Sequence, residues 1–260
     1  MTRYICLIVL MLLLIATTAG WSNNILFYVL SDRKDSGGWY TGPGDVVSLT
    51  DPVKAAGHSV KVEDETTVKD LTSVVLSKYD HIWILEGDED STVEVSKDEA
   101  EALYQYYQQG AVIWISAEEG AWAEDTKVFM NRFDVDVENG VSGPAGPKID
   151  SDHPLFKDVK TLRYDGGQGG LIVKNPDVSV IWQYPSNAGK KDAIALLDKK
   201  GYVVFEAGWV SGYAYRPEAA GDGNIQFALN IAEIKPRLGV MPTDKKLTLT
   251  WGKVKKKVIQ

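Results

Sequence analysis

Cysteine and histidine are both scarce in this chain. Among 260 residues there is one cysteine, Cys6, and three histidines, His58, His81 and His153. Cys6 lies in an apolar N-terminal segment that we expect to be removed, so the mature protein would have no disulfide, no thiolate nucleophile and no cysteine metal ligand. Because three scattered histidines do not form a zinc-binding pattern, a zinc centre is not expected either.

Basic residues are outnumbered by acidic ones. The chain has 28 Lys and Arg against 36 Asp and Glu, which gives a formal net charge of -8. Proteins that bind nucleic acid neutralise phosphates with clustered Lys and Arg. The acidic composition therefore argues against a nucleic-acid partner.

Long hydrophobic runs are missing except near the N-terminus. Residues 5–15 are apolar, Arg3 precedes them, and small residues occupy positions 16–20. The run is shorter than the roughly 20 residues of a membrane-spanning helix, and this layout is typical of a cleaved secretory signal. We predict a signal peptide over residues 1–20, an exported protein, periplasmic or extracellular, and no transmembrane segment after cleavage. A retained membrane anchor is the alternative.

The C-terminal segment reverses the charge of the rest of the chain. Residues 237–260 hold seven basic residues against one acid, Asp244. Residues 246–252 alternate in the manner of a strand, and lysines follow them. Two interpretations remain open: a tag that contacts the cell envelope, or a terminal strand with a solvated end. The predicted parts are a signal peptide (1–20), one α/β domain (21–236) and a basic tail (237–260).

The clearest local pattern is a strand, a helix and a second strand in close succession. Residues 79–85 form a short apolar run rich in β-branched and aromatic side chains, which predicts a buried strand. Ser96 and Glu99 have the spacing of a capping box, and Gly110 can end the helix that they begin. Residues 111–115 predict the second strand. Elements joined this closely favour a βαβ unit with parallel strands.

The rest of the chain extends this pattern. Strands and helices alternate up to residue 133, and from residue 171 short strands follow one another, including an antiparallel hairpin. We therefore predict an α/β fold: a doubly wound, mostly parallel sheet with helices on both faces and an antiparallel hairpin at one edge. The further predicted elements are strands 24–30, 58–62, 171–173, 178–184, 193–197 and 202–207, helices 45–56, 68–77 and 121–133, and a last helix that Asp222 caps and Pro236 ends.

Several phrases of the sequence resemble the class I glutamine amidotransferase-like superfamily, which has a flavodoxin-like α/β fold. The resemblance covers about residues 24–235 and implies that fold here. The chain most resembles the exported branches that lack amidotransferase activity, in which the fold serves as a binding or accessory domain. The phrases are Tyr79-Asp80 opening a strand, Ser96 capping a helix that ends in Gln109-Gly110, a tight turn at Ser116, the run His153-Pro154-Leu155-Phe156, and Gly208 before a closing helix at 224–231.

The chain departs from the catalytic members of that superfamily at the nucleophile. In those members a cysteine occupies the turn, and a histidine and glutamate pair later in the chain activates it. The matching position here is Ser116, and no histidine follows His153. A serine without a nearby base is a poor nucleophile at neutral pH. Glutamine amidotransferase activity is therefore not expected.

The loops expected beyond the carboxyl ends of the strands are the predicted ligand surface, since open α/β sheets bind ligands there. These loops combine carboxylates with aromatic side chains, a mixture that suits a polyhydroxylated ligand: aromatic faces stack on sugar C–H surfaces and carboxylates accept hydroxyl hydrogens. The alternative is that the aromatic side chains fill the top of the core and that the acids are solvated. The candidate ligand-binding residues are Trp39, Tyr40, Asp88, Glu119, Trp122 and Trp209.

Other chemistries are secondary candidates in the same loops. Glu86 and Glu118 would follow neighbouring strands, and carboxylates about 5 to 9.5 Å apart can hydrolyse glycosides. Ser116 is the corresponding candidate for ester hydrolysis. Asp88 and Asp90 offer oxygen ligands to Ca²⁺, although the glycine and distal glutamate of an EF-hand are missing.

Two functional hypotheses follow. The leading one is a non-catalytic binding or interaction domain with a carbohydrate or protein partner. The alternative is a hydrolase that acts on carbohydrate or ester substrates through the loop carboxylates or Ser116. No cofactor is expected, because the glycine-rich segment 31–45 lacks the phosphate-binding motifs and its own aspartates would repel phosphate.

Overall fold

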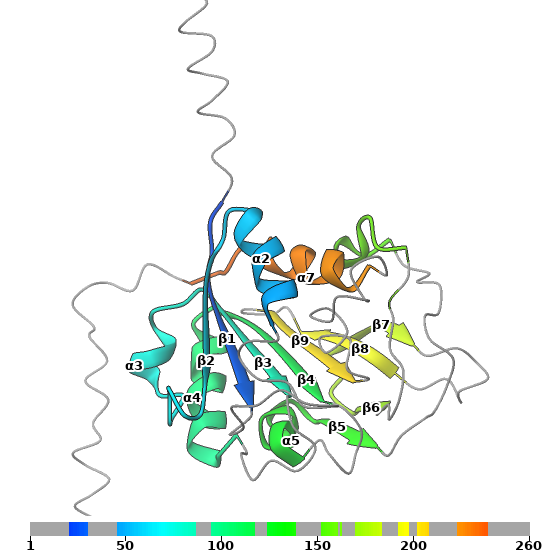
Figure 1. Ribbon diagram of the computed structural model, residues 1–260. Coiled ribbons are helices and arrows are strands. Elements are labelled where there is room, and N and C mark those ends of the chain that lie inside the picture. Colours follow the sequence, from blue (N-terminus) through cyan, green and yellow to red (C-terminus); the bar gives the residue numbers. More distant parts are fainter. Residues whose placement is uncertain are drawn as a thin grey trace, which may run out of the picture.

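The computed structural model describes residues 21–30, 46–86, 95–117, 124–138, 152–160, 162, 170–183, 192–197, 202–207 and 223–238. These residues form one nine-stranded sheet with helices on both faces (Figure 1). The predicted α/β fold is confirmed.

Five strands make the parallel part of the sheet. Their order is β2 (Ser59–Asp64), β1 (Asn24–Leu30), β3 (His81–Glu86), β4 (Val112–Ala117) and β9 (Tyr202–Ala207). All four pairings between them are parallel. β1, β3, β4 and β9 are buried along most of their described length, as expected for parallel strands covered on both faces.

The sheet continues beyond β9 with antiparallel strands. β8 (Asp192–Leu197) pairs with β9 in the predicted antiparallel sense. β6 (Gly170–Val173) and then β5 (Val135–Glu138) extend the sheet, and β7 (Ser179–Gln183) also pairs with β8. The antiparallel region is therefore larger than a single hairpin.

One face of the sheet is covered by α2 (Val47–Ala55), α7 (Asn224–Ala232) and the short helix η2 (Pro154–Phe156) (Figure 1). Aromatic side chains fill the space beneath them. The ring centroids of Trp83 and Trp114 lie 4.9 Å apart in an edge-on contact, and Trp114 meets Phe227 of α7 at 5.9 Å. We call this side of the sheet the α7 face.

The opposite face, the α4 face, is covered by α3 (Ser73–Leu76), α4 (Lys97–Gln108), α5 (Glu124–Met130) and η1 (Asn131–Phe133). Phe133 is the centre of an aromatic cluster in which its ring contacts Tyr107, Phe129 and Phe205 at centroid distances of 5.3, 5.2 and 5.4 Å. The cluster joins α4, α5 and η1 to β9.

The predicted capping box begins α4. The Glu99 amide donates to Ser96 Oγ at 3.3 Å, and the Ser96 amide donates to Glu99 Oε2 at 2.9 Å. The second carboxylate oxygen, Glu99 Oε1, accepts the amide of Leu71 at 2.8 Å. One buried carboxylate thus caps α4 and also fixes the chain before α3.

Two predicted details are wrong. The helix predicted over 68–77 is limited to Ser73–Leu76, because the preceding chain is held in a turn by Asp64 and by the bond from Leu71 to Glu99. The N-cap of α7 is Gly223, in the left-handed conformation and without a side-chain cap. Asp222, the predicted cap, lies outside the described residues.

Residues 234–238, which we call the crossing segment, leave α7 and run along the amino ends of the strands. Ile234 packs on the α7 face and Leu238 on the α4 face. Between them, the Arg237 amide donates to the carbonyl oxygen of Gly110 at 2.7 Å, and the Arg237 guanidinium lies 4.6 Å from the centre of the Tyr202 ring. The segment therefore carries the chain from one face of the sheet to the other.

Candidate functional site

The carboxyl ends of β1, β3, β4 and β9 lie along one edge of the sheet, because these strands are parallel neighbours. The loops after them, where the ligand surface was predicted, are residues 31–45, 87–94, 118–123 and 208–222. These loops lie outside the described residues, and so do the predicted site residues Trp39, Tyr40, Asp88, Asp90, Glu118, Glu119, Trp122 and Trp209.

At this carboxyl edge the structure brings Ser116 and Glu206 together. They are register partners on β4 and β9, and both are fully buried. Neighbouring strands are about 4.8 Å apart, so the two side chains leave the sheet side by side. They share the α7 face with Trp114 and Val204, which precede them by two residues on the same strands. Glu86, the last residue of β3, is outside the set of residues whose side chains the structure describes.

A third buried polar residue, Asn224, begins α7. Because α7 ends at the amino side of the sheet, where Asn23 bonds to Ala232, its first turn points towards the carboxyl edge. Phe227, one turn later, contacts Trp114, two residues before Ser116. We refer to Ser116, Glu206 and Asn224 as the buried polar group of the carboxyl edge.

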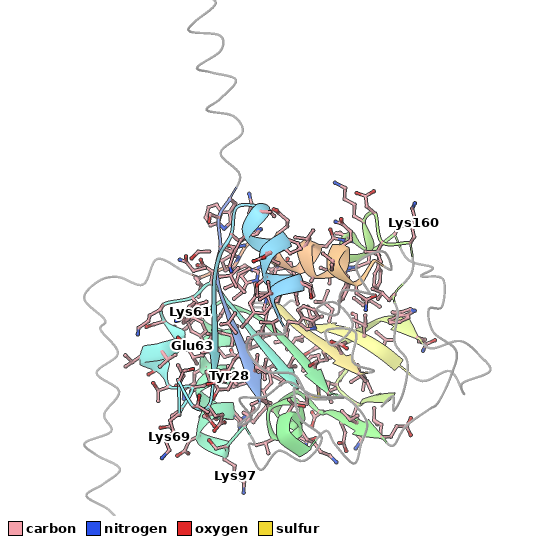
Figure 2. All side chains as sticks on the ribbon, viewed as in Figure 1. Tyr28, Lys61, Glu63, Lys69, Lys97 and Lys160 are labelled. Atoms are coloured by element: carbon pink, nitrogen blue, oxygen red, sulfur yellow. The ribbon has the colours of Figure 1, made fainter. Side chains whose placement is uncertain are left out.

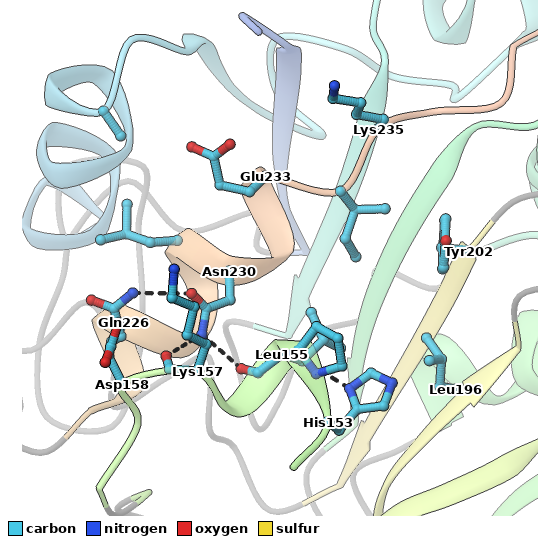
Figure 3. A pocket seen from close by; sticks show the side chains of 14 residues that line it. His153, Leu155, Lys157, Asp158, Leu196, Tyr202, Gln226, Asn230, Glu233 and Lys235 are labelled. Carbon is cyan, nitrogen blue, oxygen red and sulfur yellow. Dashed lines mark hydrogen bonds between the residues drawn. The ribbon is translucent and has the colours of Figure 1, made fainter. Parts of the chain in front are cut away.

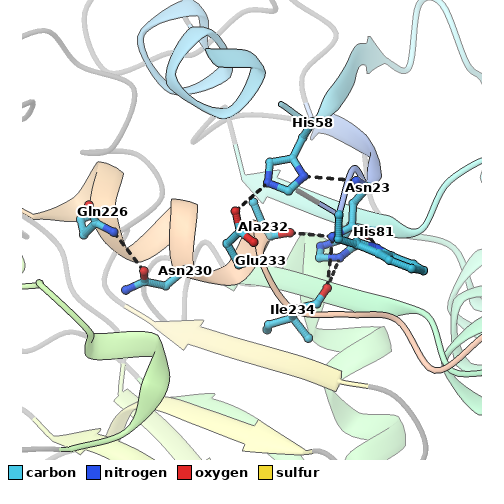
Figure 4. A network of polar contacts seen from close by, with 9 residues as sticks. Asn23, His58, His81, Gln226, Asn230, Ala232, Glu233 and Ile234 are labelled. Carbon is cyan, nitrogen blue, oxygen red and sulfur yellow. Dashed lines mark hydrogen bonds and ion pairs between the residues drawn. The ribbon is translucent and has the colours of Figure 1, made fainter. Parts of the chain in front are cut away.

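Two of the three histidines lie at the opposite edge of the sheet. His58 precedes β2 and His81 is the first residue of β3, so both are at the amino ends of the strands (Figure 4). His81 is the register partner of Val112, and Ser116 is four residues further along β4, about 13 Å at the rise of a strand. Neither histidine can therefore act as a base for Ser116.

Both amino-end histidines hold the chain at the end of α7. His81 Nε2 lies 2.8 Å from the carbonyl oxygen of Ile234. His58 Nδ1 accepts the amide of Asn23 at 3.2 Å, and His58 Nε2 lies 3.4 Å from Glu233 Oε1. Figure 4 shows this network joining β1, β3 and α7. Its role is structural.

Burial controls the protonation of His81. The side chain is completely enclosed, and desolvation lowers its pKa to about 3, while the hydrogen bond to Ile234 partly opposes this shift and nearby His58 adds to it. His81 is therefore neutral at neutral pH and donates from Nε2 to the carbonyl oxygen.

His153 caps η2. Its Nδ1 accepts the amide of Leu155 at 3.3 Å, directly before Pro154, and its ring contacts Phe156 edge-on. This bond fixes the turn that begins η2. Of the three histidines, His58 and His81 are thus too far from Ser116 to activate it, and His153 has a structural contact in η2.

Asp64, the carboxylate at the end of β2, has a structural role. Asp64 Oδ1 accepts the amides of Thr66 and Thr67 at 3.0 and 2.9 Å and both hydroxyls at 2.7 and 3.0 Å. Burial raises the pKa of Asp64, but these hydrogen bonds outweigh burial and lower it overall. Asp64 therefore closes a turn.

A cavity of about 870 Å³ lies between η2, α7, the start of β9 and the end of β8 (Figure 3). No local sequence pattern predicts this cavity, since its walls come from separate elements. Asn230 Nδ2 donates to the carbonyl oxygens of Leu155 and Lys157 at 2.9 and 2.8 Å, and Gln226 Nε2 donates to Asn230 Oδ1 at 3.0 Å. These bonds fasten η2 to α7, and the two bonds from Asn230 Nδ2 occupy both of its hydrogens.

The described part of the chain meets neither the requirements of a metal site nor those of a membrane-spanning helix. It contains no group of three or more His, Cys, Asp or Glu that could hold a metal ion. None of its helices has the length and apolar character needed to cross a membrane.

Comparison with known proteins supports the fold. No protein-family model and no curated protein sequence matches the chain. The mmIFT52 N-terminal domain superposes with a TM-score of 0.57 at 12% identity, over 80% of this chain and 94% of that one. A ThuA-like protein from Bacteroides uniformis, which has a class I glutamine amidotransferase-like fold, gives 0.52 at 15% identity, over 83% and 91%.

A third similar structure belongs to a longer chain. The exo-beta-1,4-mannosidase Op5Man5 from Opitutaceae bacterium strain TAV5 gives a TM-score of 0.52 at 10% identity, over 82% of this chain but only 36% of that one. Identities this low show a shared fold alone. The predicted amidotransferase-like, flavodoxin-like architecture is confirmed at that level.

Proposed function

We propose that this protein is an exported, non-catalytic binding domain whose ligand surface is the carboxyl edge of the sheet. The observation that carries the proposal is the placement of the histidines. All three have structural contacts, and His58 and His81 lie at the amino ends of the strands, away from Ser116. Ser116 itself is fully buried. Because Ser116 is buried and the two amino-end histidines are too far away to act as its base, we expect it to be a poor nucleophile.

Removal of residues 1–20 is compatible with the fold. The first described residue, Trp21, bonds through Nε1 to Asn23 Oδ1 at 2.6 Å, and Asn23 is the first fully buried residue. Cleavage after Ala19 or Gly20 would keep the contacts that β1 makes with the other described residues. Export to the periplasm or the exterior follows from this signal peptide.

Carbohydrate is the first ligand class to test. The aromatic and acidic residues predicted for the loops of the carboxyl edge suit a sugar, and a mannosidase chain contains a region of the same fold. An accessory domain that holds a sugar without cleaving it needs stacking surfaces and hydroxyl acceptors, but no activated nucleophile.

A thermal-shift titration of the mature chain, from Trp21 onward, tests this proposal. The panel consists of manno-, gluco- and galacto-oligosaccharides, Ca²⁺ and glutamine. A ligand that binds only the folded state raises the melting temperature with concentration. We expect a shift with an oligosaccharide that Trp39→Ala or Trp122→Ala abolishes. Trp21→Ala is the matched control, because Trp21 is 54% exposed at the opposite end of the sheet. A panel without any shift would contradict the proposal of a sugar ligand.

The hydrolase alternative is tested separately. A fluorophosphonate probe labels activated serines, and labelling that Ser116→Ala removes would establish an ester hydrolase. Release of reducing ends from the oligosaccharide that binds, lost in Glu86→Gln or Glu118→Gln, would establish a glycoside hydrolase. We expect neither labelling nor release.

A further inference from the structure

β2 is an outer strand of the sheet. Among the described residues it pairs only with β1, in parallel register. The Ser59 amide donates to the carbonyl oxygen of Asn23 on the β1 side at 2.9 Å, whereas the Asp64 amide donates to the Thr67 hydroxyl instead. Because successive amides of a strand point to opposite sides, those of Val60 and Val62 point to the outer edge. Such an edge is a template for one further strand.

The surface beside this edge is apolar on one face and charged on the other. On the α7 face, Val60 and Val62 are only half-buried. On the α4 face, Lys61 Nζ and Glu63 Oε1 pair at 3.2 Å; both side chains are labelled in Figure 2. A strand added here would bury apolar side chains on one face and present polar ones on the other.

We propose that residues 246–251 of the C-terminal tail pair with β2 as the outermost strand of the sheet. Their sequence alternates: Leu247, Leu249 and Trp251 would share one face, and Thr248 and Thr250 the other. The leucines and the tryptophan match the half-buried valines beside α2. The threonines match the face that carries Lys61 and Glu63.

The length of the chain fits this placement. The described chain ends at Leu238, next to Gly110 at the amino end of β4. Four strand spacings separate β4 from a position outside β2, about 19 Å. Residues 239–245 can span about 24 Å when extended. The tail can therefore reach the outer edge with little slack.

The direction of the tail and the charges that follow residues 246–251 both fit this placement. The tail comes from the amino ends of the strands, so it would enter parallel to β2 without crossing the sheet. The lysines at 253 and 255–257 would then lie beyond the carboxyl end of β2, next to Asp64 and Glu65. Opposite charges at this distance attract each other. This inference is independent of the proposed ligand surface.

Amide hydrogen exchange on the mature chain tests the pairing. We expect the amides of Val60 and Val62 to exchange at least tenfold more slowly in the wild type than in Leu249→Asp. Thr248→Asp is the matched control, since it places the same charge one residue earlier on the polar face. It should leave the protection of both valines unchanged. Exchange at Val60 and Val62 that is equally fast in the wild type and in Leu249→Asp would overturn the proposal.

A disulfide experiment distinguishes the chain's own tail from that of a second copy. In the mature Lys61→Cys, Thr248→Cys variant the two introduced cysteines are the only ones, because Cys6 is removed with residues 1–20. Under oxidation we expect a cross-linked monomer. Cross-linked dimers, or two thiols that stay free, would overturn the proposal that the tail folds back on its own β2.

Discussion

His81 Nε2 lies 2.8 Å from the carbonyl oxygen of Ile234, and this contact joins the first residue of β3 to the chain that leaves α7. The side chain is fully buried and its pKa is lowered to about 3, mainly by desolvation. The unfolded chain binds a proton at this histidine near pH 6.5, whereas the folded chain does not until about pH 3. The contribution of neutral His81 is therefore complete above pH 6.5 and is lost progressively as the pH falls towards 3.

The first prediction concerns His81→Gln, which keeps a donor but cannot titrate. Each pH unit between 6.5 and 3 costs the wild type about 1.4 kcal/mol that the variant does not lose. Between pH 7 and pH 4.5, the difference in unfolding free energy should shift in favour of the variant by about 2 to 3 kcal/mol. Urea unfolding at both pH values measures it. A difference that does not change with pH would show that folding does not lower the pKa of His81.

The second prediction concerns Asn23. Its Nδ2 donates to the carbonyl oxygens of Ala232 and Ile234 at 2.7 and 3.2 Å, in the buried end of α7. Asn23→Ala removes the Asn23 donor from the Ala232 oxygen, whereas the Ile234 oxygen keeps its contact with His81, and the variant should lower the unfolding free energy by about 1 to 3 kcal/mol. Asn24→Ala is the control: Asn24 is exposed and bonds to Asp80 through its backbone amide and carbonyl, so the loss should stay within about 0.5 kcal/mol. Equal losses would mean that Asn23 does not hold α7.

Much of the fold could be predicted because its signals are local. The capping box of Ser96 and Glu99, the end of α4 at Gly110 and the apolar strands on either side are all readable within one stretch of chain. The helix predicted over residues 68–77 failed for a non-local reason. The Leu71 amide bonds to Glu99, a residue on another element, and this bond keeps the chain before α3 out of a helix.

The site was predictable only in part. The sequence placed Ser116 at the end of a strand and showed that no late histidine exists. It could not show that Glu206 lies beside Ser116, because β9 pairs with β4 from far along the chain. The cavity beside η2 was missed for the same reason: Leu155, Asn230 and Tyr202 meet only in the folded protein.

The third prediction concerns the start of α4. Ser96 Oγ accepts the Glu99 amide, so Ser96→Ala should lower the unfolding free energy by about 1 kcal/mol. Thr72, the N-cap of α3, makes no side-chain capping bond, and Thr72→Ala should cost less than about 0.5 kcal/mol. Urea unfolding of both variants compares the two caps directly. A larger loss for Thr72→Ala than for Ser96→Ala would contradict the capping box.

The fourth prediction concerns Gly110 and the crossing segment. Gly110 has a φ of +104°, and an added Cβ would lie 2.3 Å from the backbone carbonyl of Arg237. Gly57 has a similar φ of +101°, but an added Cβ there meets no atom within 4 Å. Both alanine variants carry the left-handed strain of about 1 kcal/mol, so the difference between them isolates the crossing segment. Gly110→Ala should lose about 1 to 3 kcal/mol more than Gly57→Ala in urea unfolding, because the backbone at Arg237 must move away. If the two variants lost the same free energy, residues 234–238 would not pack against the end of α4, and the tail would leave the domain from a different place.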